Sequence, residues 1–235
     1  HLLFANIVFA QTTLFDQSFS GSSTVTDYIG STGTTFFTDL TASSSTTVGI
    51  NSGALEFVKA GTGSGRFVRN NPALNPSTQT LYIEFDLAVT ASEATQLSAA
   101  VFYLGSEDGM PTTGFNNNGT VPENADVYCK LGFNFIGTSG GFQVRNVSGS
   151  ANGATTVSDQ SFHRITMIVN KSGDVIRYLV PGTLDTYLTL GSNKWQVYVD
   201  GIQQFASDLN PTTSARELSF MKFIFDGGIG SGTLG

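Results

Sequence analysis

The stretch K-W-Q-V-Y-V-D-G-I-Q-Q-F, Lys194–Phe205, decides the fold prediction. Its first half alternates apolar and polar residues, with Trp195, Val197 and Val199 on one side, as in a strand with one buried face. Asp200-Gly201 suits a two-residue type I′ turn, because Gly accepts positive φ and Asp tolerates it. Ile202–Phe205 is then predicted to return as the partner strand. Such a hairpin is not stable alone in water, so the sequence predicts a sheet around it.

Other stretches supply that sheet. The clearest is Leu81–Val89, where alternate residues from Ile83 to Val89 are predicted to point inward. Leu218–Phe225 is apolar on both faces and predicts a strand covered on both sides. Further strands are expected over Leu14–Phe19, Thr24–Tyr28, Thr35–Leu40, Ala54–Ala60, Arg66–Arg69, Ala99–Leu104, Val127–Ile136, Phe142–Val147, Phe162–Val169 and Val175–Leu179. Many short strands joined by polar turns indicate an all-β protein.

The segment W-Q-V-Y-V-D-G resembles the hairpin of concanavalin A-like lectin and laminin-G-like β-sandwiches, in which an aromatic-led strand ends in Val-Asp-Gly. The order of elements from Phe15 to Phe225 is similar to modules of that superfamily from secreted bacterial proteins. The resemblance implies one jelly-roll β-sandwich of two antiparallel sheets, which we place at residues 11–226. It implies a fold more directly than an activity.

Composition excludes some classes of partner. The 235 residues carry a formal net charge of −7, and only 12% of them are charged. Nucleic acid is not expected as a partner, because no basic patch is present to neutralise phosphates. The single cysteine, Cys129, cannot form an intramolecular disulfide, and we interpret it as a small buried core residue.

Residues 1–10 are almost entirely apolar and allow two interpretations. Val8-Phe9-Ala10 before Gln11 fits a signal-peptidase site, so the segment is either the remnant of a signal peptide or a functional strand. It is too short to span a bilayer. As a strand it is expected to insert into another subunit through Leu2, Leu3, Phe4, Ile7, Val8 and Phe9. Both alternatives predict an extracellular or cell-surface protein.

The other end of the chain, Gly227–Gly235, is rich in glycine and is expected to be a flexible tail. Modules of the resembled kind continue through a glycine turn into one more strand, and that strand is expected to be missing here. A missing last strand beside an apolar first segment favours strand complementation between copies. The first functional hypothesis is therefore a non-catalytic structural or adhesive protein that self-assembles into a filament or surface polymer.

The alternative is a carbohydrate-binding module of a larger secreted protein. Gly105–Ala125 is a long stretch without periodicity, and such loops are often functional, as is the second expected loop, Pro181–Asn193. Sugar sites combine an exposed aromatic ring with nearby amides and carboxylates. The candidate glycan-binding residues are Tyr103, Asp108, Asn116, Asn117, Asn118 and Tyr187. The competing interpretation is that Asn-Asn-Asn-Gly is ordinary turn chemistry.

No catalytic residue and no cofactor are predicted. Retaining glucanases on the lectin-like sandwich carry Glu-x-Asp-x-x-Glu, and here Glu84-Phe85-Asp86 is followed by Val89 where the second glutamate is needed. We therefore interpret Glu84 and Asp86 as a solvated strand face. His163 is expected to have a surface or cross-strand role rather than that of a general base. No Cys/His cluster indicates zinc, while calcium has only Glu107, Asp108 and nearby carbonyls, without a loop motif.

Overall fold

The computed structural model describes residues 12–30, 33–70, 79–93, 95–106, 115–116, 118–227 and 230–235. The predicted assembly residues between Leu2 and Phe9 lie outside this part of the chain. The elements are the 3₁₀ helices η1 (Val25–Tyr28) and η2 (Asn124–Asp126) and the strands β1 (Asp39–Ala42), β2 (Thr46–Asn51), β3 (Ala54–Lys59), β4 (Gly65–Asn70), β5 (Thr80–Ser92), β6 (Gln96–Gly105), β7 (Val127–Phe135), β8 (Phe142–Asn146), β9 (Ala151–Val157), β10 (His163–Asn170), β11 (Ile176–Leu179), β12 (Tyr187–Leu190), β13 (Lys194–Val199), β14 (Ile202–Gln203), β15 (Phe220–Phe225) and β16 (Gly230–Leu234).

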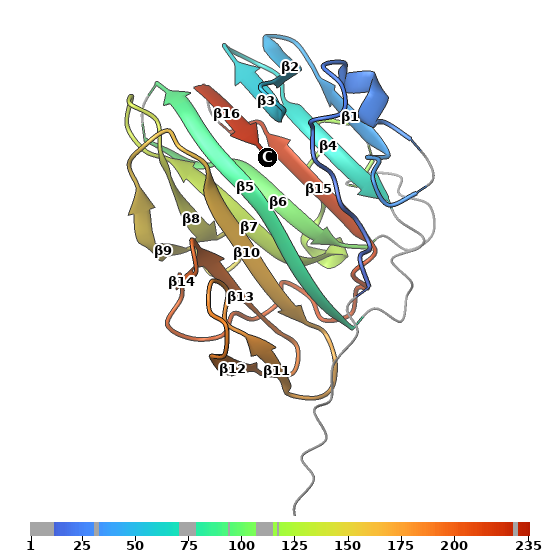
Figure 1. Cartoon of the computed structure of the whole chain (residues 1–235), viewed down its shortest axis with the longest axis vertical. Helices are drawn as coiled ribbons and strands as arrows, with labels where there is room; N and C mark the ends of the chain where they lie inside the picture. Colours follow the sequence, from blue (N-terminus) through green and yellow to red (C-terminus); the bar gives the residue numbers. More distant parts are fainter. Residues whose placement is uncertain are drawn as a thin grey trace, which may run out of the picture.

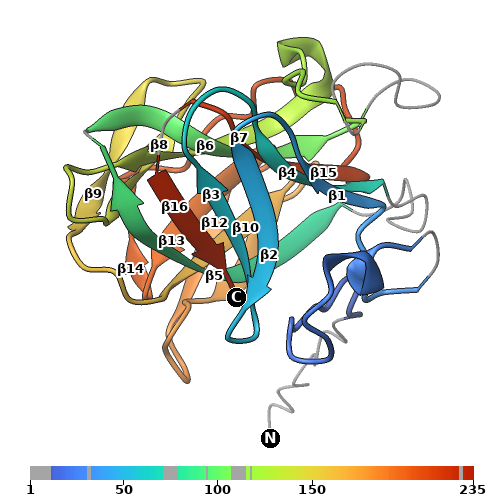
Figure 2. The same ribbon diagram turned by 90° about the horizontal axis from the view of Figure 1, so that it is seen from above.

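Two seven-stranded sheets stack face to face (Figures 1 and 2). Sheet 1 has the order β1-β4-β15-β6-β7-β8-β9, and sheet 2 has the order β14-β13-β10-β5-β16-β3-β2. Neighbouring strands in both sheets are antiparallel, so the predicted all-β sandwich of two antiparallel sheets is confirmed. Within the described ranges, none of the helices is long and apolar enough to cross a membrane.

The opening hairpin forms at the predicted turn. Asp200 and Gly201 have φ values of 49° and 77°, the left-handed pair that a type I′ turn requires. Val199 pairs with Ile202, although β14 ends at Gln203, earlier than predicted. Trp195 is buried, and its Nε1 donates to the Asn210 carbonyl at 2.9 Å. The indole thus fills the core without leaving its polar group unpaired.

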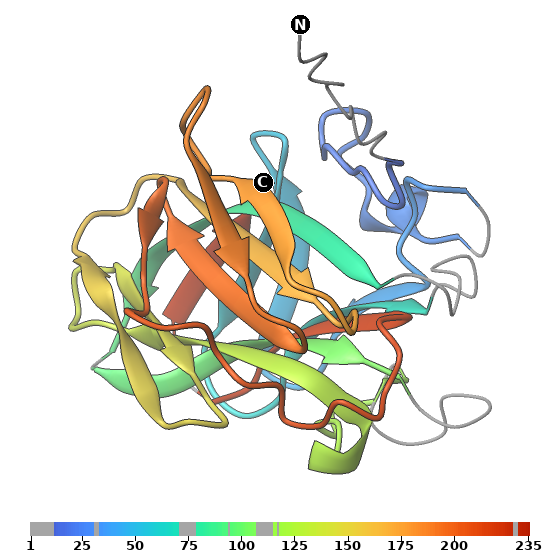
Figure 3. The same cartoon turned by 90° about the horizontal axis from the view of Figure 1, so that it is seen from below.

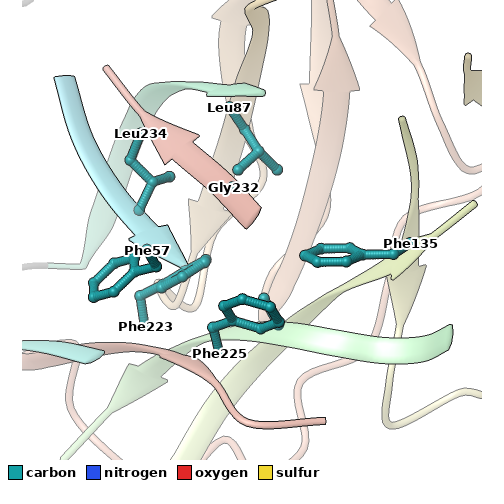
Figure 4. A pocket seen from close by; sticks show the side chains of 8 residues that line it. Phe57, Leu87, Phe135, Phe223, Phe225, Gly232 and Leu234 are labelled. Atoms are coloured by element: carbon teal, nitrogen blue, oxygen red, sulfur yellow. The ribbon is translucent and has the colours of Figure 1, made fainter. Parts of the chain in front are cut away.

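The core lies between the inner faces of the two sheets. Phe223 and Phe225 of sheet 1 face Leu87 and Leu234 of sheet 2 across a cavity of about 10 Å³ (Figure 4). All the residues that line this cavity are apolar, so it offers no partner for a water molecule and we expect it to be dry. The alternation predicted for Leu81–Val89 is confirmed here, because Leu87 and Val89 are buried in the main core.

The C-terminal tail prediction is wrong for residues 230–235. β16 lies in the middle of sheet 2, between β3 and β5, and Leu234 is buried. Its glycines have a structural reason, since a Cβ on Gly230 would lie 2.2 Å from the Ala91 carbonyl oxygen. The gap that strand complementation was meant to fill is therefore occupied by the chain's own last strand. Assembly through residues 1–10 stays a prediction. However, the gap that was expected to accept this segment is filled by β16.

A hairpin replaces the predicted loop Pro181–Asn193. β11 does not pair with β10, the strand before it in the chain, but with β12, and β11 and β12 form a small sheet of their own. Residues on one face of this hairpin, including Tyr178, pack against Ile168 and Tyr198 on the outer face of sheet 2. The N-terminal predictions also need correction, since Thr24–Tyr28 contains η1 and Leu14–Phe19 forms no strand.

Candidate functional site

An exposed aromatic ring lies on the outward face of the β11–β12 hairpin. Tyr187 is 48% exposed, and the Arg177 guanidinium carbon lies 4.3 Å from its ring centroid. The strand register explains the contact, because Arg177 pairs with Thr189 and Leu179 pairs with Tyr187, which places all four on one face. A guanidinium at this distance orients the ring by a cation–π interaction. Of the predicted glycan-binding residues, Tyr187 is the one placed as an exposed platform.

The hairpin carries more exposed apolar surface at its tip. Leu184 is 97% exposed, and Leu179 beside Tyr187 is also exposed. Figure 3 shows the orange hairpin projecting from the body of the sandwich. We use the name hairpin patch for Arg177, Leu179, Leu184, Tyr187 and Thr189. Its apolar side chains are exposed and contribute little to the fold.

Tyr103 is not part of this site. Its side chain is 5% exposed on β6 and packs with Val101, Phe115 and Ile224 in a second apolar cluster on the outer face of sheet 1. Burial raises the pKa of the Tyr103 hydroxyl far above its usual value, and the charge of Asp226 raises it further. Its prediction as a sugar platform is wrong, because Phe115 and its neighbours cover this face.

The asparagines of the first long loop hold a turn. The Asn116 Oδ1 accepts from the backbone N–H of Asn118 at 3.1 Å, and the Asn118 Oδ1 accepts from that of Thr120 at 3.0 Å. This is the turn chemistry considered above as the competing interpretation. Asn117 and Asp108 lie outside the described residues, so their part in glycan binding stays untested.

A buried ammonium group organises the same loop. Lys222 of β15 is fully buried, and its Nζ donates to the carbonyls of Asn116, Asn118 and Thr120 at 3.1, 3.0 and 2.7 Å. The three backbone carbonyl oxygens thus bind a cation that belongs to the chain itself, the Lys222 ammonium. Glu107, suggested for calcium with Asp108, likewise lies outside the described residues. Within the described ranges, no cluster of three or more histidine, cysteine or acidic side chains could hold a metal ion.

Glu84 and Asp86 lie on the outer face of sheet 2, as predicted. Asp86 forms a two-point ion pair with the Arg164 guanidinium, at 2.9 and 3.1 Å. Glu84 accepts from the Thr166 hydroxyl at 3.2 Å, and the exposed ring of Tyr82 is its neighbour on β5. These cross-strand partners occupy the two carboxylates, which fits the expected role as a strand face.

His163 is the centre of a polar cluster that the sequence did not reveal. Its Nδ1–H donates to Asp200 at 2.6 Å and its Nε2–H to Asp159 at 2.9 Å. The Ser161 hydroxyl lies 3.2 Å from Nε2, which reproduces the contacts of a Ser–His–Asp triad. However, Ser161 also donates to Asp159, so Asp159 takes both the serine proton and the Nε2 position. The cluster therefore serves as a cross-strand clasp.

This clasp predicts a pH dependence of stability. Burial alone would lower the pKa of His163, but hydrogen bonds to Asp200 and Asp159 outweigh it and raise the pKa above 6.5. The folded protein then binds more protons than the unfolded chain. The His163 contribution is fully present below pH 6.5 and is lost as the pH rises through the raised pKa.

The measurement is the free energy of unfolding in urea at several pH values between about pH 2 and pH 9. Wild type should lose stability relative to His163→Asn across the upper part of this range. On the acid side, the pKa of Asp159 is lowered by its hydrogen bonds to Ser161 and then His163, so Asp159→Asn should become less damaging as the pH falls. Parallel profiles for wild type and His163→Asn would contradict the role of the clasp.

Comparisons with known proteins identify no family for this chain. No family model matches the sequence, and no curated protein matches it. A carbohydrate esterase from the Shiga toxin-encoding bacteriophage phi24B is 14% identical, with 83% of this chain and 86% of that chain covered and a TM-score of 0.48. The Emp47p carbohydrate recognition domain is 9% identical, with 83% and 87% covered and a TM-score of 0.48.

A carbohydrate-binding module from Bacillus subtilis is 9% identical, with 83% of this chain and 93% of that chain covered and a TM-score of 0.36. At these identities the likeness concerns the fold alone and identifies no ligand. This chain's own two sheets show that it is a two-sheet, antiparallel β-sandwich.

Proposed function

We propose that this protein is a non-catalytic, extracellular carbohydrate-binding module. The observation that carries the proposal is the exposed Tyr187 ring, held by Arg177 on a hairpin that projects from the sandwich. Sugar rings present apolar C–H faces that pack on aromatic rings, and their hydroxyls bond to guanidinium and hydroxyl groups. The hairpin patch offers both kinds of contact, with Thr189 beside Arg177 as the hydroxyl.

Charge indicates the class of polysaccharide. The chain has a formal net charge of −7, so a polyanionic glycan would be repelled at long range. A neutral polysaccharide meets no such barrier and can contact the hairpin patch through stacking and hydrogen bonds. We therefore expect neutral chains, bound along an open surface rather than in a deep pocket.

Affinity electrophoresis through gels that contain xylan, laminarin or galactomannan tests the proposal. Wild type should be retarded by at least one of them, and Tyr187→Ala should weaken the interaction about tenfold through loss of the stacking ring. Tyr82→Ala is the matched control, because it removes a comparably exposed tyrosine from β5. No retardation of wild type by these or a wider set of neutral polysaccharides, or an equal effect of the two variants, would refute the proposal.

A further inference from the structure

A second, larger cavity opens between the two sheets, away from the hairpin patch. It measures about 150 Å³ and is surrounded mainly by phenylalanine rings. Sheet 1 contributes Phe67, Phe102, Met221 and Phe223, and sheet 2 contributes Ile83, Phe85 and Leu234. The segment before β1, dark blue in Figure 2, flanks the sandwich and adds residues from Phe15 to Phe19 as well as Phe37.

The walls of this cavity are already ordered as stacked and tilted ring pairs. Phe37 lies 4.7 Å from Phe67, which lies 5.5 Å from Phe223, and Phe85 lies 5.7 Å from Phe102. These centroid separations are the ones at which aromatic rings attract each other. A planar ring that enters the cavity can therefore pack against these phenylalanine rings at similar centroid separations.

The flanking segment is fixed in place, so the cavity is preformed. Arg69 of β4 is buried, its guanidinium donates to the carbonyls of Gly33 and Phe36, and it lies over the Phe15 ring at 5.5 Å. Phe15 packs in turn on Phe37 at 5.1 Å. This wall of the cavity is thus already ordered before a ligand binds. Binding does not need to order the segment, which lowers its entropic cost.

We infer that this cavity is a binding site for a small, neutral, planar aromatic group. The cavity of about 150 Å³ is lined mainly by apolar side chains, and an apolar cavity of this size accepts a ligand as large as benzene. Asp16 is an exposed residue of the lining, and its negative charge at the mouth disfavours an anionic ligand. The site is distinct from the hairpin patch and does not depend on glycan binding.

Isothermal titration calorimetry with indole, benzene and benzoate tests this inference on the full chain. Wild type should bind indole and benzene with a negative heat-capacity change, the mark of apolar burial, and benzoate at least about tenfold more weakly. Ile83→Phe extends a ring into the cavity from sheet 2 and should abolish binding. Ile83→Val is the matched control at the same position, which leaves the cavity open and should still bind.

Met221→Phe fills the cavity from sheet 1. It provides the same test of ligand binding if Ile83→Phe does not fold. Either folded filling variant should be at least as resistant to heat as Ile83→Val while losing indole binding. Absence of indole and benzene binding by wild type would overturn the inference. So would unchanged binding by a folded filling variant, because the ligand would then lie elsewhere.

Discussion

A chain truncated after Gly227 is expected to be unfolded. The deletion removes β16, which pairs along its whole length with β3 on one side and β5 on the other. Each ladder hydrogen bond contributes about 0.5–1.5 kcal/mol net, and burial of a leucine such as Leu234 about 2–5 kcal/mol. Their sum is comparable to the whole stability of a domain, about 5–15 kcal/mol. Circular dichroism and urea unfolding of the truncated chain provide the measurement.

The control keeps the strand and removes only one side-chain interaction. Ser231→Ala deletes the 2.7 Å hydrogen bond between the Ser231 and Thr90 hydroxyls and should change stability by about 1 kcal/mol. A synthetic peptide of residues 228–235 should restore the spectrum of the truncated chain, because it returns the missing central strand. A truncated chain as stable as wild type would restore the interpretation of these residues as a dispensable tail.

Strands with a strong apolar pattern could be predicted from sequence, and strands without one could not. β5 and β13 bury one face against the core, so their alternation appears in the sequence. β2 and β9 are edge strands with few buried positions, and their Thr, Gly and Asn residues are typical of loops. β16 was not predicted for another reason, since a central strand seldom contains three residues as small as Gly230, Ser231 and Gly232.

The candidate site was predictable only in part. The Tyr187 ring was identified as a candidate, but its contact with Arg177 depends on the register of a hairpin whose second strand was predicted as a loop. Tyr103 could have been excluded, because Ala99–Leu104 is apolar on both faces and such a run indicates cover on both sides. The His163 cluster joins His163 and the residues just before it to Asp200, 37 positions after His163, which periodicity alone does not reveal.

Lys222→Met is expected to be the most damaging single substitution on the outer face of sheet 1. Methionine fills nearly the same volume but cannot donate, so the Asn116, Asn118 and Thr120 carbonyls lose the ammonium they now share. Buried acceptors without a donor cost about 1–3 kcal/mol each, and loss of one member of a buried charged network costs about 3–5 kcal/mol. Urea unfolding should show a loss of this size.

The matched control is Lys130→Met on the neighbouring strand β7. Lys130 lies opposite Tyr103 on the same face and bonds to the Asn124 side chain, but it is only half-buried. Its replacement should therefore cost less than about 1 kcal/mol. Added calcium should not rescue Lys222→Met, since the ring supplies neutral carbonyls and no carboxylate among the described residues. Equal effects of the two substitutions would show that water satisfies the three carbonyls as well as the ammonium does, and that the loop does not depend on its internal cation.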